Sequence, residues 1–216
     1  MSSRIWIGMA LGSVACAVPA QETPPAGDIA DNDSVAEIAV APVTETRSAG
    51  TLSWEELSIR MVGRETSAGL RIDVTTLEDY MLDVAAPDIR TYLLDLKRRA
   101  REQSGISERA IREMKSFLVG FTGFEKEVDY DPTLLYIRSE ASTFHPFHII
   151  PVSRGFERRV VGLYQTVYAV YLFDPAMDLN ATLDFRYAEL SSGSAWRSLV
   201  NRVNRAQARG ERDTGR

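Results

Sequence analysis

The sequence predicts an α+β fold that is mainly β, with a single folded domain over residues 53–209. Short runs in which apolar and polar residues alternate predict strands, apolar residues at helical spacing follow the second run, and an apolar stripe lies near the C-terminus. The chain has 216 residues, 44 % hydrophobic and 25 % charged. These values are ordinary for one globular domain with appendages.

The first two strands are predicted to form an antiparallel hairpin. Residues 57–61 and residues 70–74 each place an apolar side chain at every second position. This period is typical of a strand with one face in water. The polar segment "GRETSAG" between them begins and ends with glycine, as hairpin connections commonly do.

A helical insertion is predicted after the second strand, over residues of about 76–115. Pro87 suits the first turn of a helix, where its missing N–H costs nothing. Gly105 is expected to end this helix and Ser107 to begin a second, shorter one. The basic run "KRRAR" near the helix C-terminus predicts a solvated face rather than a nucleic-acid site. The apolar residues at helical spacing are Ile89, Tyr92, Leu93, Leu96 and Ala100.

The remainder of the domain is predicted to be rich in strands. Residues 116–124 and 133–139 are short apolar runs, and residues 181–190 alternate between apolar and polar. Residues 160–173 are apolar at successive positions, so we expect one long central strand covered on both faces. Roughly seven short strands separated by turn signals predict an immunoglobulin-like antiparallel β-sandwich.

A C-terminal amphipathic helix is predicted to begin after Ser194 and to end at Gly210, followed by a disordered basic tail over residues 210–216. Its apolar stripe consists of Trp196, Leu199, Val200 and Val203. The predicted core of the domain includes Leu57, Ile59, Ile72, Leu93, Leu96, Phe121, Val167, Tyr171, Phe185 and Trp196.

The N-terminus is predicted to be an export signal over residues 1–20. Arg4 precedes the apolar run "IWIGMALGSVACAV", which is too short to span a bilayer as a helix. The segment "SVAC" resembles a bacterial lipobox, with Ser13 where that pattern prefers leucine. The resemblance implies that Cys16, the single cysteine, is lipidated and becomes the mature N-terminus. The alternative is cleavage after Ala20, which would release a soluble protein.

Residues 21–52 are predicted to be a disordered tether. The segment is rich in proline and alanine, holds no aromatic residue, and carries six acids against one base, Arg47. Such a composition buries too little apolar area to offset the entropy of ordering. The net charge of −5 for the whole chain also argues against binding to a nucleic-acid backbone.

No complete catalytic motif occurs in the chain, and we expect no cofactor. The two histidines, His145 and His148, are three residues apart around Pro146. On a regular strand this odd spacing sends their side chains to opposite faces, which predicts no tight metal site. The remaining candidate metal ligands are loop carboxylates, which suit calcium but lack the EF-hand spacing. They are Asp129, Asp131, Asp174 and Asp178.

These observations predict a non-enzymatic protein of the cell envelope, exported to the periplasm or the outer envelope. It would be lipid-anchored if Cys16 is modified and soluble otherwise. Its expected partner is an envelope protein or a surface polymer. The alternative is an exported hydrolase or metal-dependent enzyme that uses the loop carboxylates and His145 or His148.

Overall fold

The computed structural model describes residues 51–62, 69–140 and 142–214. The predicted export signal, Cys16 and residues 21–50 of the predicted tether lie outside these residues. Leu52, which the sequence analysis placed in the tether, is buried and forms a bridge with Ala85, so the folded domain already includes it. The helices are α1 Trp54–Leu57, α2 Asp79–Leu82, α3 Pro87–Gln103, α4 Glu108–Glu113 and α5 Ala195–Thr214.

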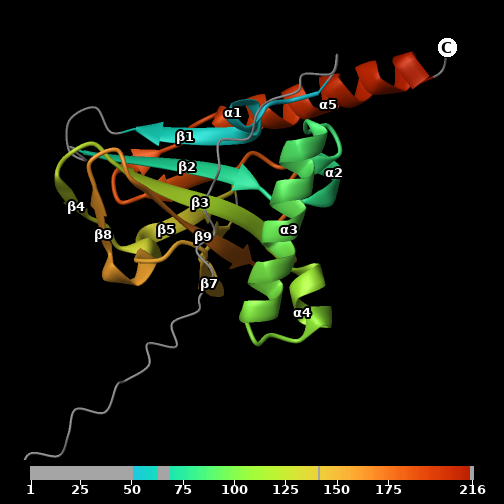
Figure 1. Ribbon diagram of the computed structural model, residues 1–216. Coiled ribbons are helices and arrows are strands. Elements are labelled where there is room, and N and C mark those ends of the chain that lie inside the picture. The colour runs from blue at the N-terminus through green and yellow to red at the C-terminus, as the bar shows by residue number, and fades with distance from the viewer. Residues whose placement is uncertain (1–50, 63–68, 141, 215–216) are drawn as a thin grey trace, which may run out of the picture. The chain divides into compact units, whose positions relative to one another are not determined.

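The described strands form three antiparallel sheets (Figure 1). Five strands pair in the order β1-β2-β3-β9-β7, four in the order β11-β10-β5-β6, and β4 pairs with β8. The prediction of a mainly β, α+β domain is therefore confirmed. The strands are β1 Ser58–Val62, β2 Leu70–Thr76, β3 Lys115–Gly123, β4 Glu127–Asp129, β5 Leu135–Arg138, β6 Thr143–Phe144, β7 His148–Pro151, β8 Val160–Gly162, β9 Thr166–Phe173, β10 Asp184–Tyr187 and β11 Leu190–Ser191.

Strands β1 and β2 form the predicted antiparallel hairpin, in which Ile59 lies opposite Val74. The residues just before β1 are helical, which the alternating pattern did not predict. Ser53 accepts a hydrogen bond from the Glu56 N–H, and Glu56 accepts one in return from the Ser53 N–H. This capping box satisfies two N–H groups that a helix start leaves free, and it explains the single turn of α1.

The helical segments α2, α3 and α4 lie between β2 and β3, where the insertion is predicted. Gly105 has a φ of +65°, the left-handed conformation that commonly follows a helix end. Tyr92 of α3 lies 5.5 Å from the Trp54 ring, which lies 6.5 Å from the ring of Tyr168 in β9. Helix α3 therefore packs on the face of the large sheet to which Tyr168 points.

The predicted long strand over residues 160–173 is wrong, because the chain turns between β8 and β9. The Gly123 N–H donates to the Gln165 carbonyl, and the Tyr164 N–H donates to the Gly123 carbonyl. A Cβ at Gly123 would come within 2.6 Å of the Gly162 carbonyl oxygen, so this close approach requires glycine. Strand β9 lies one position from the sheet edge, and β3 takes the centre that the prediction gave to residues 160–173.

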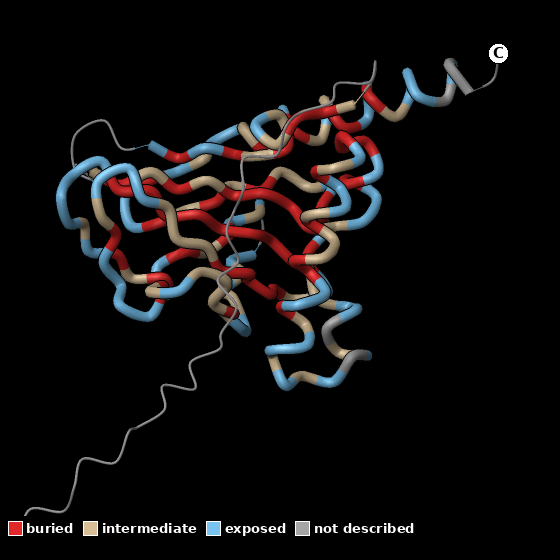
Figure 2. Tube along the Cα trace, in the orientation of Figure 1, coloured by how far each residue is buried: buried red, intermediate tan, exposed pale blue. Residues whose placement is uncertain are grey.

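Figure 2 shows buried residues along the strands of the larger sheet, and between the two larger sheets aromatic rings from both pack together. Phe117 of β3 meets Phe185 of β10 at 5.2 Å between ring centroids, and Phe121 meets Tyr187 at 5.7 Å. Two buried tyrosines of this core have satisfied hydroxyls: Tyr171 donates to the Pro132 carbonyl at 2.9 Å, and Tyr130 donates to the Phe156 carbonyl at 2.6 Å. Every predicted core residue is buried except Val167, which is partly buried against the core.

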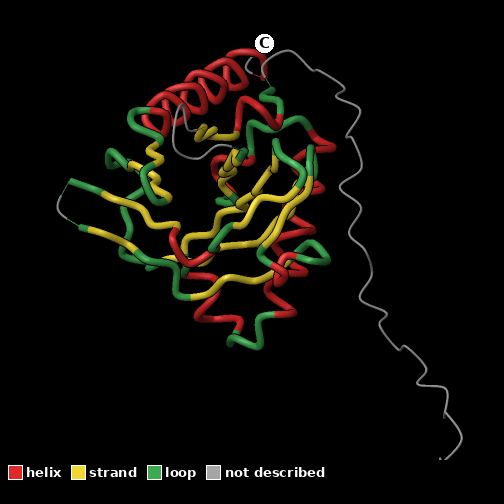
Figure 3. The backbone as a smooth tube through the Cα atoms, turned by 90° about the vertical axis from the view of Figure 1, so that its left-hand side faces the viewer, coloured by secondary structure: helices red, strands yellow, loops and turns green. Residues whose placement is uncertain are grey.

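Helix α5 is held on the core by Trp196, whose ring is 1 % exposed. The ring packs edge-on against Phe117 at 5.9 Å, and its N–H donates to the Leu179 carbonyl at 2.9 Å. The predicted helix end at Gly210 is wrong, since α5 continues to Thr214. Gly210 does not adopt the positive φ that ends a helix, so it only weakens the helix locally. In the side view of Figure 3, α5 lies above the strands and ends near the C-terminus.

Replacing Trp196 with alanine should destabilise the protein by roughly 3–5 kcal/mol, because it removes a large buried ring at the junction of both sheets and α5. Urea denaturation of the full chain measures this loss. The matched control is Arg197→Ala, which changes the neighbouring exposed residue of the same helix and should leave the midpoint unchanged. Equal midpoints for Trp196→Ala and the parent protein would show that α5 does not dock through this ring.

Candidate functional site

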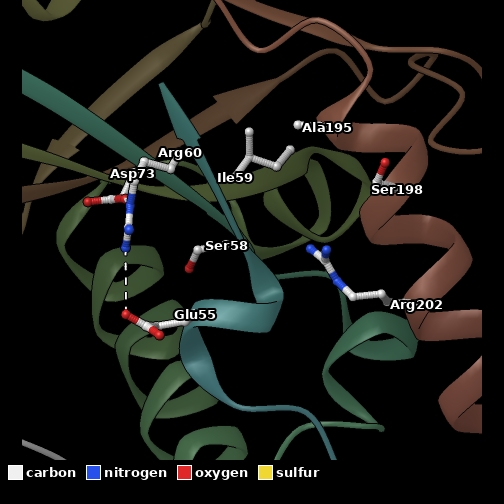
Figure 4. Close-up of a pocket in the computed structure, with 8 residues that line it drawn as sticks. All are labelled: Glu55, Ser58, Ile59, Arg60, Asp73, Ala195, Ser198 and Arg202. Carbon is white, nitrogen blue, oxygen red and sulfur yellow. Dashed lines mark hydrogen bonds and ion pairs between the residues drawn. The ribbon is translucent and has the colours of Figure 1, made fainter. Parts of the chain in front are cut away.

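A groove of about 460 Å³ lies between the outer edge of β1 and helix α5 (Figure 4). This volume is in the range of about 300–1,000 Å³ that is usual for ligand sites. Its residues come from α1, β1, β2 and α5, so chain segments far apart in the sequence build it. They are Glu55, Ser58, Ile59, Arg60, Asp73, Ala195, Ser198 and Arg202.

Strand β1 is the edge of the five-stranded sheet, and its register shows which peptide groups face the groove. The Leu77 N–H donates to the Ser116 carbonyl. In the β2–β3 register, this bond means that the backbone N–H and C=O groups of the odd-numbered β2 residues face β3. Successive residues of a central antiparallel strand direct their backbone groups to opposite neighbours, so the even-numbered Ile72 and Val74 face β1. They form their backbone hydrogen bonds with Met61 and Ile59. Arg60 and Val62 must therefore direct their N–H and C=O groups outward.

These outward groups are open in the described part of the chain. There the structure records no hydrogen-bond partner for the N–H or C=O of Arg60 or Val62. The first residue of the strand differs, since the Ser58 N–H donates to the Glu55 carbonyl at the end of α1. The edge thus offers unpaired backbone groups directly beside α5.

The side chain of Arg60 is already engaged by carboxylates. Its Nε lies 3.0 Å from Asp73 Oδ1, and an Nη lies 3.6 Å from Glu55 Oε1. The hydrogen bond with Asp73 outweighs partial burial and raises the pKa of the Arg60 guanidinium. Asp73 also pairs with Arg71 Nε at 2.7 Å, so two guanidinium groups balance the two carboxylates of this wall.

The guanidinium of Arg202 is positioned differently. Its Nε donates to the Glu56 carbonyl at 3.2 Å, which fixes the side chain between α5 and α1. Figure 4 shows the guanidinium pointing from α5 toward β1 and into the groove. Among the described residues, no carboxylate lies within ion-pair distance of Arg202. A cation with free N–H donors therefore faces the groove.

The structure places the two histidines in different surroundings. His145 is exposed and stacks on Tyr136 at 5.6 Å, beside the smaller sheet. His148 is also exposed and lies on β7 of the larger sheet, opposite Leu172. Within the described ranges, no group of three or more histidine, cysteine, aspartate or glutamate residues is arranged to hold a metal ion.

The candidate carboxylates lie on separate turns and strands rather than at one centre. Asp174 accepts a hydrogen bond from the Ala176 N–H, and Asp178 accepts one from the Asn180 N–H. Asp131 accepts from the N–H and hydroxyl of Thr133, and the side-chain bond is the main reason that its pKa is lowered. Asp129 is exposed on β4. Three of these four residues thus stabilise local turns.

Asp184 has a structural role that the sequence did not indicate. It accepts hydrogen bonds from the Ser191 hydroxyl, the Gly193 N–H and Arg186 Nε, at 2.7, 3.0 and 2.8 Å. Partial burial would raise the pKa of Asp184, but these donors together outweigh it and lower the pKa. The carboxylate therefore fixes the loop that leads into α5.

Sequence reasoning did not single out any residue of the groove as functional. The sequence pattern places Arg202 within the predicted C-terminal helix and Arg60 at a polar position of the first predicted strand. One local signal was available, because position 202 directly precedes Val203 of the apolar stripe and so borders the docked face. The contact of Arg202 with the Glu56 carbonyl of α1, next to β1, depends on the tertiary fold, since the two residues are 146 positions apart.

Asp184→Asn should lower the stability at pH 7 by about 1–2 kcal/mol, since hydrogen bonds to a charged acceptor are stronger than those to an amide. A lowered carboxylate pKa contributes stability that is present above the unfolded-state pKa of about 3.9 and is lost as the pH falls through the folded-state pKa. Urea denaturation at pH 7 and pH 3 should show the difference between the two proteins shrinking at pH 3. A difference of the same size at both pH values would contradict an ionic role for Asp184.

No protein-family model, curated protein or solved structure matches the chain.

Proposed function

We propose that the protein is a binding module that adds an extended segment of a partner protein to the free edge of β1. The observation that carries this proposal is the outward-facing backbone of Arg60 beside an open groove. An extended peptide can pair with such an edge through main-chain hydrogen bonds, while flanking pockets accept alternate side chains. The groove between β1 and α5 supplies those flanks.

The edge of β1 carries only some of the devices that usually block strand addition, although the strand is short and holds the charged Arg60. Proteins commonly protect sheet edges with proline, lysine, bulges or a covering segment. Strand β1 reads "SIRMV", pairs with β2 in a continuous register, and contains neither proline nor lysine. Helix α5 runs beside the edge but presents the small residues Ala195 and Ser198 there, which leaves room for an added chain.

The proposed location follows from the sequence: export, with a lipid anchor if Cys16 is modified. Among the described residues, no helix is long and apolar enough to cross a membrane. We also propose that the two facing sheets form an immunoglobulin-like sandwich. Their antiparallel pairing supports this proposal. The geometry favours binding over an exported hydrolase or metal-dependent enzyme, because the candidate carboxylates and histidines lie apart on separate elements.

Two variants at one position test strand addition. Arg60→Ala and Arg60→Pro both remove the guanidinium and its pairs with Asp73 and Glu55, but only proline also removes the outward N–H. Proline is tolerated on an edge strand when its nitrogen faces outward, so both variants should fold. The probe is the acetylated and amidated peptide Thr-Val-Thr-Gln-Thr-Val-Thr, titrated into the isotope-labelled full chain and followed by NMR.

The parent protein should bind this peptide with shift changes centred on β1. Arg60→Ala should change the Kd by less than about threefold, whereas Arg60→Pro should raise it about tenfold, because it loses a hydrogen bond and gains a steric block. Equal binding by the two variants would contradict pairing through the Arg60 N–H. Chemical-shift changes confined to residues of another surface would contradict binding at β1.

A further inference from the structure

We infer that the segment bound along β1 carries a carboxylate, and that Arg202 selects for it. This inference rests on the proposed function and adds the chemistry of the partner. The partner is an extended protein segment in which an apolar residue and an acidic residue lie on the same face, two positions apart. Three features of the groove support it, namely the direction of the side chains, the spacing along α5 and the distribution of charge.

Side chains of an added strand are directed by the strand beside it. Ile59 is buried on the face of the sheet that packs toward the core and α5. A residue opposite Ile59 in the added strand would point to the same side. There it would meet Ala195 and Ser198, which leave space for an apolar side chain of moderate size.

The next side chain on that face falls near Arg202. Residues two apart in a strand are separated by about 6.6 Å, and residues four apart in a helix by about 6 Å. The distance from Ser198 to Arg202 along α5 therefore matches the distance between two successive side chains on one face of the added strand. Figure 4 shows that Arg202 lies toward the α1 end of the groove. The residue that it meets is thus two positions from the one opposite Ile59.

The charges of the groove leave one cation for this position. Arg60 belongs to the other face of the sheet and already pairs with Asp73 and Glu55. Arg202 is held by its Nε on the Glu56 carbonyl, which leaves its two Nη groups as donors toward the groove. A guanidinium in a fixed position binds a carboxylate with strong, directional hydrogen bonds. An amide of the same shape would lack the charge that strengthens them.

The test compares two peptides that differ only at the central residue, acetylated and amidated Thr-Val-Thr-Glu-Thr-Val-Thr and Thr-Val-Thr-Gln-Thr-Val-Thr. The glutamate has a valine two positions away on either side, so the design serves both directions of strand addition. The parent protein should bind the glutamate peptide at least about tenfold more tightly than the glutamine peptide. In Arg202→Gln this ratio should fall below about twofold, and in Arg202→Lys it should be intermediate.

Arg197→Gln is the matched control, because it removes the same charge from an exposed position of α5 that does not line the groove. It should keep the tenfold ratio. If the parent binds both peptides equally well, the inference about Arg202 is wrong while strand addition stands. If the parent binds neither peptide, the proposed function fails and the inference fails with it. An equal loss of the ratio in Arg197→Gln and Arg202→Gln would assign the preference to overall charge and overturn the role of Arg202.

Discussion

The packing of Trp196 against Phe117 and Phe185 is the contact on which the remaining architecture depends. The three rings come from α5, β3 and β10, with centroid separations between 5.2 and 5.9 Å. Edge-on aromatic pairs of this kind add specific geometry to the burial of large apolar areas. One cluster thus joins the larger sheet, the smaller sheet and the C-terminal helix, and it sets the position of α5.

The groove is a consequence of that position. Docking through Trp196 places Ala195, Ser198 and Arg202 beside β1, and among the described residues none bonds to the outward backbone groups of Arg60 or Val62. Asp184 supports the same arrangement from the other end, because it fixes the loop that precedes α5. The unpaired backbone of a sheet edge can invite unwanted association with other chains. A dedicated partner for the edge would resolve this risk.

Local patterns in the sequence predicted the elements whose formation is decided locally. The alternation over residues 181–190 correctly predicts a strand with Phe185 in the core, and Pro87 begins α3 as expected. The break between β8 and β9 was missed because it depends on the approach of Gly123 to Gly162, which are distant in sequence. The groove was missed for the same physical reason, because Glu56 and Arg202 are 146 residues apart and meet only in the tertiary fold. The capping box of Ser53 and Glu56 could have been read from the sequence.

The most direct test of the account is amide hydrogen exchange along β1 in the full chain, measured with and without the glutamate peptide. The register assigns the N–H groups of Ile59 and Met61 to hydrogen bonds with β2, and that of Arg60 to the open edge. We therefore expect slow exchange at Ile59 and Met61 and fast exchange at Arg60 in the free protein. Addition of the peptide should slow exchange at Arg60 at least about tenfold. An Arg60 amide that is as protected as that of Ile59 before any peptide is added would contradict an open edge at β1.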